Sequence, residues 1–321
     1  MRYVLQRLVQ FLIVFFLVTF GVMCFLRLGL NAPGDPARTM LGGFPSEEQI
    51  AATTERYRLD SNYLVQYWYW LKGMVQLDFG FSVQNSLPVS SLIKGRAMTT
   101  VLLGLYAITF GVLVAIPTAV YAAYKRDRLL DKLTSGATFL VVSFPTIVLA
   151  VFLSALFVTR WELFPRIGDK IYPWEDLGAH FENFFLPSLA LGLPIAAVLT
   201  RLLRADMVLT LQSDFISLAR AKGISPGRIL WRHALRNSVF SLITSIGVQL
   251  GALIGGAVVV ELFFDLDGMG SMLIVAVLSS DLFTVQAAVA LLVGTVVVAN
   301  LLIDLMYSVI DPRIRVARAL G

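Results

Sequence analysis

Six long apolar runs dominate the sequence and predict an all-α integral membrane protein. Each run is about long enough to cross the roughly 30 Å hydrocarbon layer of a bilayer as a helix. The runs lack the short alternation of apolar and polar positions typical of a membrane barrel, and helices satisfy their own backbone groups in lipid. They cover residues 8–26, 99–123, 133–159, 186–203, 239–260 and 284–306. We therefore expect six transmembrane helices.

Composition agrees with this pattern. The 321 residues are 57% hydrophobic and only 15% charged, whereas a soluble domain is about half apolar and about a quarter charged. Arg2 and Arg7 precede the first run, as in a signal peptide, but the apolar core is too long and residues 31–33 make a poor cleavage site. The first run is expected to remain as a membrane anchor.

Lysine and arginine are concentrated in alternate connections between the runs. One set holds 16 of the 26 basic residues and 5 acidic ones, and the other set holds 10 basic and 15 acidic residues. The first set is 1–7, 124–132, 201–238 and 308–321, and the second is 27–98, 159–185 and 261–284. Because cytoplasmic loops retain positive charge, both termini are expected in the cytoplasm. The net charge of +5 is thus the sum of a basic inner face and an acidic outer face. It does not indicate nucleic-acid binding.

The sequence has few residues that could form a disulfide, a metal site or a phosphate-binding loop. Cys24 is the single cysteine, so neither a disulfide nor a metal-thiolate site is expected. His180 and His233 fall on opposite sides of the predicted membrane and cannot share a metal. None of the six lysines is followed by Ser or Thr, so a phosphate-binding loop of the Walker type is absent. Any energy for transport must come from another chain or from an ion gradient.

The interior of the membrane runs also lacks ionisable groups that could serve ion coupling or catalysis. Asp304, Arg201 and Glu261 all lie near helix ends, and the middle of each run carries no charge. This argues against a proton- or sodium-coupled carrier, which normally needs an ionisable group at that depth. An intramembrane enzyme is disfavoured because the runs lack facing aspartates or a Ser with a His.

The basic loop at 204–238 has a definite pattern. Ser213 is expected to cap a helix over 214–222 whose one face carries Phe215, Leu218, Ala219 and Lys222, and Gly223 is expected to end it. Ser225 should cap a second helix that begins at Pro226. Its arginines are spaced four apart, at Arg228, Arg232 and Arg236.

Two interpretations of this loop remain. The basic residues can simply enforce topology and contact anionic headgroups. Topology alone does not require a capped helix broken at a glycine, however. A short rigid helix projecting from a membrane domain is what a cytosolic motor could use as a lever.

At this point the sequence resembles a known family. Asp214-Phe215-Ile216, Ala219-Arg220-Ala221-Lys222-Gly223 and His233-Ala234-Leu235-Arg236-Asn237 are similar to the coupling loop of binding-protein-dependent ABC importer permeases, in the oligopeptide and dipeptide branch. Further matches run nearly end to end, among them Pro33-Gly34-Asp35-Pro36, Asp78-Phe79-Gly80-Phe81-Ser82 and Asp311-Pro312-Arg313-Ile314-Arg315. The long segment after the first run resembles the B-type subunit.

The resemblance implies the type I ABC importer permease fold, with six helices and both termini in the cytoplasm of a prokaryotic cell. A second homologous permease, two ATPase subunits and an extracytoplasmic substrate-binding protein would complete the importer. ATP and Mg would bind the ATPases, and this chain, which is no enzyme, would bind no cofactor and no metal. The implied coupling residues are Asp214, Phe215, Leu218, Ala219, Arg220, Ala221, Lys222, Gly223, Arg228, His233 and Asn237.

The solute implied by the resemblance is an oligopeptide or dipeptide. Related permeases serve nickel and other small solutes, so such a solute is the alternative, and an ion-coupled secondary carrier is a more distant one. The sequence divides into the first helix at 1–30, an extracytoplasmic amphipathic segment at 31–98, a five-helix core at 99–307 and a cytoplasmic tail at 308–321.

Small residues and prolines mark the membrane runs. Gly247, Gly251 and Gly255 recur every fourth residue and allow close helix contact, either within the chain or at a subunit seam. Pro117, Pro145 and Pro194 interrupt three runs and predict kinks.

The outer segment contains two predicted helices. Ser46 and Gln49 form a capping box for a helix to about residue 57. An aromatic amphipathic stretch follows, with Tyr63, Tyr67, Trp68, Trp70 and Leu71. We expect it at the membrane surface, with a part in docking the binding protein as the alternative.

Overall fold

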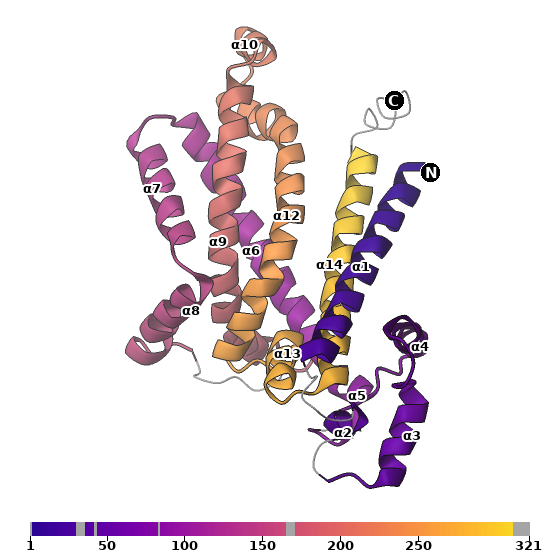
Figure 1. Ribbon diagram of the computed structural model, residues 1–321. Helices are drawn as coiled ribbons and strands as arrows, with labels where there is room; N and C mark the ends of the chain where they lie inside the picture. Colours follow the sequence, from indigo (N-terminus) through magenta and orange to yellow (C-terminus); the bar gives the residue numbers. More distant parts are fainter. Residues whose placement is uncertain (1, 30–35, 42–43, 83, 165–170, 311–321) are drawn as a thin grey trace. The chain divides into compact units, whose positions relative to one another are not determined.

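A computed structural model describes residues 2–29, 36–41, 44–82, 84–164 and 171–310. The motifs at 33–35 and 311–315 and most of the predicted tail at 308–321 lie outside the described residues. Figure 1 shows the helices. Their bounds are α1 Arg2–Gly29, α2 Pro36–Leu41, α3 Glu47–Tyr57, α4 Tyr63–Val75, α5 Val89–Ile93, α6 Arg96–Tyr124, α7 Leu129–Ser143, α8 Thr146–Ser154, α9 Leu177–Leu211, α10 Asp214–Ala221, α11 Pro226–Arg228, α12 Leu235–Phe263, α13 Met269–Leu278 and α14 Leu282–Ile310. Two π-helical turns, η1 Ala155–Arg160 and η2 Ile229–Ala234, and a hairpin of β1 Phe81–Ser82 with β2 Leu87–Pro88 complete them.

The apolar runs form membrane-spanning helices. Within the described residues, five helices are long and apolar enough to cross a bilayer. They are Leu5–Arg27, Val89–Tyr124, Leu177–Leu211, Pro226–Phe263 and Leu282–Ile303. The predicted run at 133–159 is different, because it is divided into α7 and α8, which meet at an angle of 103°. The pair makes a sixth span if both helices are counted as one.

The break between α7 and α8 has a local cause. Pro145 has no N–H to donate to the preceding turn, and the residue before it, Phe144, is extended at φ −90° and ψ 130°. The sequence predicted a kink at this position, and the structure has a complete break. Pro117 and Pro194, by contrast, lie inside continuous helices.

The fourth span begins earlier than its apolar run. The side chain of Asp176 accepts hydrogen bonds from the backbone N–H groups of Gly178 at 2.8 Å and Ala179 at 3.1 Å, which caps α9 at Leu177. The helix therefore begins nine residues before the predicted run at 186–203. Hydropathy marks only the part of the helix that lies in lipid, and α9 extends beyond it.

The helices group into two compact units. The first consists of Met1–Thr100 with Asp267–Leu301, and the second of Val101–Leu266 with Leu302–Gly321. In the first unit, the predicted Ser46–Gln49 capping box is confirmed. The backbone N–H of Gln49 donates to Ser46 Oγ at 3.2 Å, and the backbone N–H of Ser46 donates to Gln49 Oε1 at 2.9 Å. Ser82 of the hairpin donates a hydrogen bond to Asp281, just before α14. This contact joins residues that are far apart in the sequence.

The second unit is built around α9. Figure 1 shows α9 and α12 running side by side, with α6 and α7 against them. The α6–α9 contact is close because it is made at glycines. A Cβ on Gly192 would lie 2.7 Å from Phe110 Cδ1 and 2.9 Å from the Ala107 carbonyl oxygen. A larger residue there would force the two helices apart.

Candidate coupling loop

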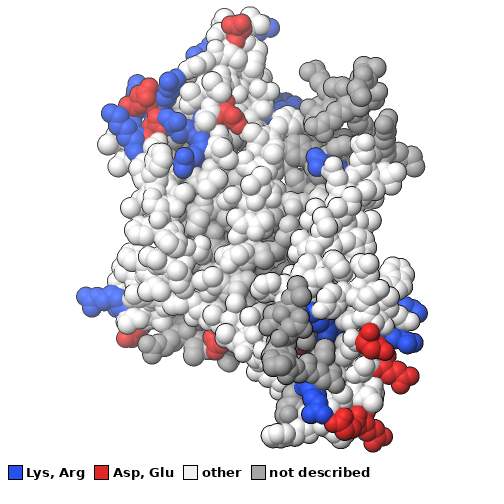
Figure 2. Space-filling view, viewed as in Figure 1, with Lys and Arg blue, Asp and Glu red and all other residues white. Residues whose placement is uncertain are grey.

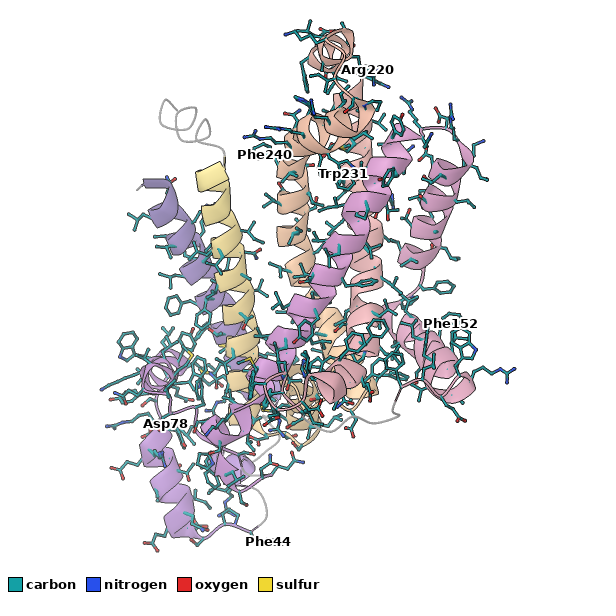
Figure 3. The ribbon with its side chains drawn as sticks, turned by 180° about the vertical axis from the view of Figure 1, so that it is seen from behind. Phe44, Asp78, Phe152, Arg220, Trp231 and Phe240 are labelled. Atoms are coloured by element: carbon teal, nitrogen blue, oxygen red, sulfur yellow. The ribbon has the colours of Figure 1, made fainter. Side chains whose placement is uncertain are left out.

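The helix α10 stands beyond the end of α9, at one end of the second unit (Figures 1 and 3). Ser213 precedes it with extended backbone, as a capping residue does, but its side chain makes no cap hydrogen bond. The Ser213 hydroxyl instead donates to the Thr210 carbonyl oxygen at 2.5 Å. The predicted side-chain cap is therefore wrong, as is that of Ser225. The Ser213 hydroxyl closes the end of α9 instead.

The turn after α10 depends on glycine. Lys222 is the C-cap of α10, and Gly223 follows it with φ +74°. The N–H of Gly223 donates to the Arg220 carbonyl at 2.9 Å, and the N–H of Ile224 to the Ala219 carbonyl at 3.2 Å. Left-handed backbone of this kind is easily adopted only by glycine. The prediction that Gly223 ends the helix is confirmed.

One face of α10 is anchored and the other is exposed. Ile216 and Ala219 are buried in the core of the second unit, together with Ile229 and Leu230 of η2. On the outer face, Phe215 is 46% and Leu218 57% exposed. The predicted face of Phe215, Leu218, Ala219 and Lys222 is thus divided, because only Ala219 packs inward. Sequence reasoning missed Ile216, since neighbouring apolar residues concealed its role.

The second helix of the loop continues into the membrane. Pro226 is its first residue, as predicted, and the chain passes from α11 through η2 into α12 without a break. Arg228, Arg232 and Arg236 are all exposed. Trp231 lies edge-on to Tyr121 of α6, with 6.2 Å between the ring centroids.

Hydrogen bonds connect the loop to three membrane helices. The hydroxyls of Thr210 on α9 and Ser238 on α12 lie 3.2 Å apart and buried, and Ser241 donates to Asp206. Arg204 of α9 binds both carboxylate oxygens of Asp131 on α7, with Nη2 at 2.6 Å from Oδ2. These contacts hold α7, α9 and α12 together at the end of the unit that carries α10.

The end of the second unit that carries α10 exposes both apolar and basic side chains. Phe215, Leu218 and Trp231 are exposed apolar side chains. The exposed polar and small residues near them are Asp214, Arg220, Ala221, Lys222, Gly223, Arg228, Arg232, Arg236 and Asn237. Ala219 is buried and His233 is half-buried. Figure 3 labels Arg220 on α10 and Trp231 nearer the membrane helices. Figure 2 shows Lys and Arg at this end of α7 and α9, above a band of uncharged surface.

Two glycines of the predicted stripe on α12, Gly251 and Gly255, make no close packing contact within the second unit. Gly251 and Gly255 are exposed, and a Cβ on either would meet no heavy atom within 4 Å. Gly256, on the adjacent face, would place a Cβ 2.9 Å from Leu191 Cδ2. The internal contact is therefore made at Gly256. Among the described residues there is also no group of three or more His, Cys, Asp or Glu that could hold a metal.

These features define a class of protein: a helical, multi-spanning membrane protein with an exposed, basic helical loop at one end. The sequence matches the family described as "Binding-protein-dependent transport system inner membrane component" over residues 115–316, and the N-terminal part of such membrane components over residues 1–104. It is 32% identical over 315 residues to the glutathione transport system permease protein GsiC of Shigella flexneri serotype 5b (strain 8401) and of Escherichia coli (strain K12). The alignment covers 98% of this chain and 99% of each relative.

The chain therefore belongs to the family of binding-protein-dependent transport system inner membrane components. It is a permease subunit of a peptide-type ABC importer and a multi-pass protein of a prokaryotic inner membrane. The resemblance drawn from the sequence motifs is confirmed.

Proposed function

We propose that this chain forms one half of the path through which an ABC importer takes up short peptides. A second, homologous permease forms the other half, two ATPase subunits bind the cytosolic face, and an extracytoplasmic binding protein delivers the solute. The related permeases are named for glutathione, which is a tripeptide. This favours an oligopeptide or dipeptide over nickel as the solute.

The orientation that we propose has six spans, counting α7 and α8 as one, and both termini in the cytoplasm. It is supported by the charge of the second unit. The end that carries α10 also carries Lys125, Arg126 and Arg128, whereas the opposite end carries Glu175, Asp176 and Glu182. Positive charge is retained on the cytoplasmic side, so α10 faces the cytosol.

The observation that carries the proposal is the two-sided burial of α10. Phe215 and Leu218 point to solvent, where an ATPase subunit can bind them, while Ile216 and Ala219 are fixed in the core. ATP and Mg bind and react on the ATPases, and this chain contributes neither cofactor nor covalent chemistry. Movement of the ATPases displaces α10, and the Thr210–Ser238 contact conveys that displacement to α9 and α12.

The second permease is proposed to pack on the glycine stripe of α12. Gly251 and Gly255 are exposed with open space above them, and Val248 and Val259 beside them are exposed as well. Small residues on a membrane helix allow a neighbouring backbone to approach closely. A helix of the second permease would fill this surface.

The coupling role can be tested by placing charge on the exposed face of α10. The variant Phe215→Asp with Leu218→Asp should leave the core residues untouched and should abolish ATP-dependent peptide uptake. Co-purification of the ATPase subunits in mild detergent should fall by at least about tenfold, since two apolar contacts are lost and two carboxylates must be desolvated.

A matched control is available at the opposite end of the same unit. Leu177 is 70% exposed at the start of α9, and Leu177→Asp adds a charge of the same sign to a site that is more exposed than Phe215 or Leu218. It should retain the ATPases. Equal retention by both variants, with equal uptake, would contradict the proposed role of α10.

A further inference from the structure

A cavity of about 130 Å³ lies within the first unit. Its walls come from the end of α1, from α3 and α4, from the segment after α4 and from the start of α14. The polar and aromatic residues that matter here are Arg27, Tyr57, Gln66, Trp70, Asp78 and Gln286. Figure 3 labels Asp78 beside α3 and α4. None of these residues takes part in the coupling loop.

Unsatisfied polar atoms are concentrated around this cavity. In the described part of the chain, five buried side-chain N or O atoms lack a hydrogen-bond partner. Three of them belong to cavity residues: Gln66 Oε1, Trp70 Nε1 and Gln286 Nε2. Gln66 and Gln286 are each only 6% exposed. Buried polar groups are normally paired, so three unpaired groups at one cavity require partners that the protein itself does not supply.

The chemistry of the ligand follows from the orientation of these groups. The Gln66 amide nitrogen donates to the carbonyls of Leu59 at 3.1 Å and Ser61 at 2.9 Å. Its Oε1 is therefore fixed as an acceptor and requires a donor. The Trp70 indole N–H can only donate, and the Gln286 amide nitrogen, which belongs to another lining residue, is a second unpaired donor.

Two charged side chains at the cavity, Arg27 and Asp78, add a cationic donor and an anionic acceptor. Arg27 also lines the cavity, and its guanidinium favours an anion. The carboxylate of Asp78, at the rim, accepts the N–H of Gly80 at 3.0 Å and lies 3.4 Å from Arg56. It can also accept from a cation, as Gln66 can. A group with an anionic acceptor at one end and an N–H donor at the other would match both sides.

The cavity lies at the boundary of the hydrocarbon layer. Arg27 ends the span Leu5–Arg27, and Gln286 lies in the first turns of the span Leu282–Ile303. Tyr67 of α4 hydrogen-bonds Thr19 at 2.6 Å, and Thr19 lies eight residues before Arg27 in α1, about 12 Å deeper. The helix α4 is therefore embedded beside α1, with Leu64 and Trp68 exposed on its outer face.

The size of the cavity limits what it can hold. A volume of about 130 Å³ accommodates a small polar group such as a headgroup. The rest of the ligand must lie outside, at the level of α4 and its exposed apolar side chains. Acyl chains fit that environment, whereas the polar backbone of a peptide does not.

We propose that this cavity binds the headgroup of a phospholipid that carries a primary ammonium, such as phosphatidylethanolamine. The phosphate accepts hydrogen bonds from Arg27, Trp70 and Gln286. The ammonium donates to Gln66 Oε1 and Asp78. The bound lipid fixes α4 against α1 and α14 at the outer surface of the membrane.

The test compares two lipids and two tryptophans. The intact importer complex is purified in detergent, stripped of lipid and titrated with phosphatidylethanolamine or phosphatidylcholine of identical acyl chains, with binding measured by native mass spectrometry. Phosphatidylcholine has no N–H to donate, so it should bind at least about tenfold more weakly. Trp70→Phe removes the unpaired indole N–H and should weaken phosphatidylethanolamine binding about threefold to tenfold.

Trp68→Phe is the matched control, because Trp68 is on the same helix, is 67% exposed and does not line the cavity. It should leave binding unchanged. Gln286→Leu should weaken lipid binding without lowering thermal stability, because it also removes an unpaired buried group. Equal binding of the two lipids, or equal effects of the two tryptophan variants, would mean that the cavity holds only water. Displacement of the lipid by glutathione or a dipeptide would make it a solute site and would overturn the proposal.

Discussion

Substitution of Gly223 by valine tests whether the shape of the coupling loop matters for transport. Gly223 has φ +74°, and a Cβ built on it meets no heavy atom within 4 Å. The substitution therefore introduces no clash, and its whole cost comes from the backbone. A non-glycine residue in the left-handed region costs about 1–3 kcal/mol, with β-branched residues at the upper end.

That cost acts directly on the position of α10. A strain of about 1–3 kcal/mol changes the equilibrium between the native turn and a relaxed one by a factor of about 5 to 150. The core contacts of Ile216 and Ala219 then compete with relief of the strain. We expect ATP-dependent peptide uptake to fall by at least fivefold, while the amount of permease in the membrane is unchanged.

Gly227 provides the control within the same loop. A Cβ on Gly227 also meets no heavy atom within 4 Å, but its φ is not positive and it lies in the helix α11. Gly227→Val should therefore transport normally. Gly223→Asn should keep most of the uptake, because asparagine tolerates left-handed backbone. If Gly223→Val and Gly227→Val transport equally well in proteoliposomes with the ATPases and the binding protein, the conformation of this turn is not required for coupling.

Two further pairs of substitutions test the support of the loop and the subunit seam. Asp131→Ala leaves Arg204 without its buried partner and should destabilise the chain by about 3 kcal/mol in thermal unfolding. Adding Arg204→Met to this variant should recover part of the loss. Equal stability of the single and the double variant would refute the role of the pair. Gly255→Leu should lower recovery of the second permease without affecting the fold of this chain, whereas Gly256→Leu collides with Leu191 and should reduce the folded yield. Normal recovery of the second permease with Gly255→Leu would exclude that surface as the seam.

The membrane spans could be predicted from the sequence because lipid acts on every residue of a span. A helix in hydrocarbon must be apolar along its whole length, so the runs at 8–26 and 239–260 mark α1 and α12 directly. The limits of the spans depend on local polar contacts instead. Asp176 extends α9 into a region with no hydropathy signal, and Pro145 divides a uniformly apolar run.

The coupling loop was predicted in position but not in detail. Gly223 could be identified because the backbone conformation at the end of α10 admits few other residues. The Ser213 cap could not be judged, because the Thr210 carbonyl lies close enough to compete for its hydroxyl. The choice between Phe215 and Ile216 as the anchor depends on where η2 passes, and a pattern of adjacent apolar residues does not contain that information.

The cavity of the first unit was beyond sequence reasoning for a related reason. Gln66 and Trp70 lie in α4, and Gln286 follows more than 200 residues later in α14. Each residue alone is an ordinary member of an amphipathic helix or a span. Only the approach of α4 and α14 to the end of α1 makes their unpaired atoms a single feature.

The length of α10 indicates how force reaches the membrane helices. A helix of eight residues is too short to be stable alone in water, so its structure depends on the burial of Ile216 and Ala219. Under the proposed function, the residues that hold the helix would also convey its motion, because α10 packs on η2. The π-helical turn η2 lies where the loop enters α12, and such turns contain a looser hydrogen-bond pattern than an α-helix. In the proposed importer, movement of the ATPases would displace α10 as a body, and the turn at η2 would let α12 change its tilt, as alternating access requires.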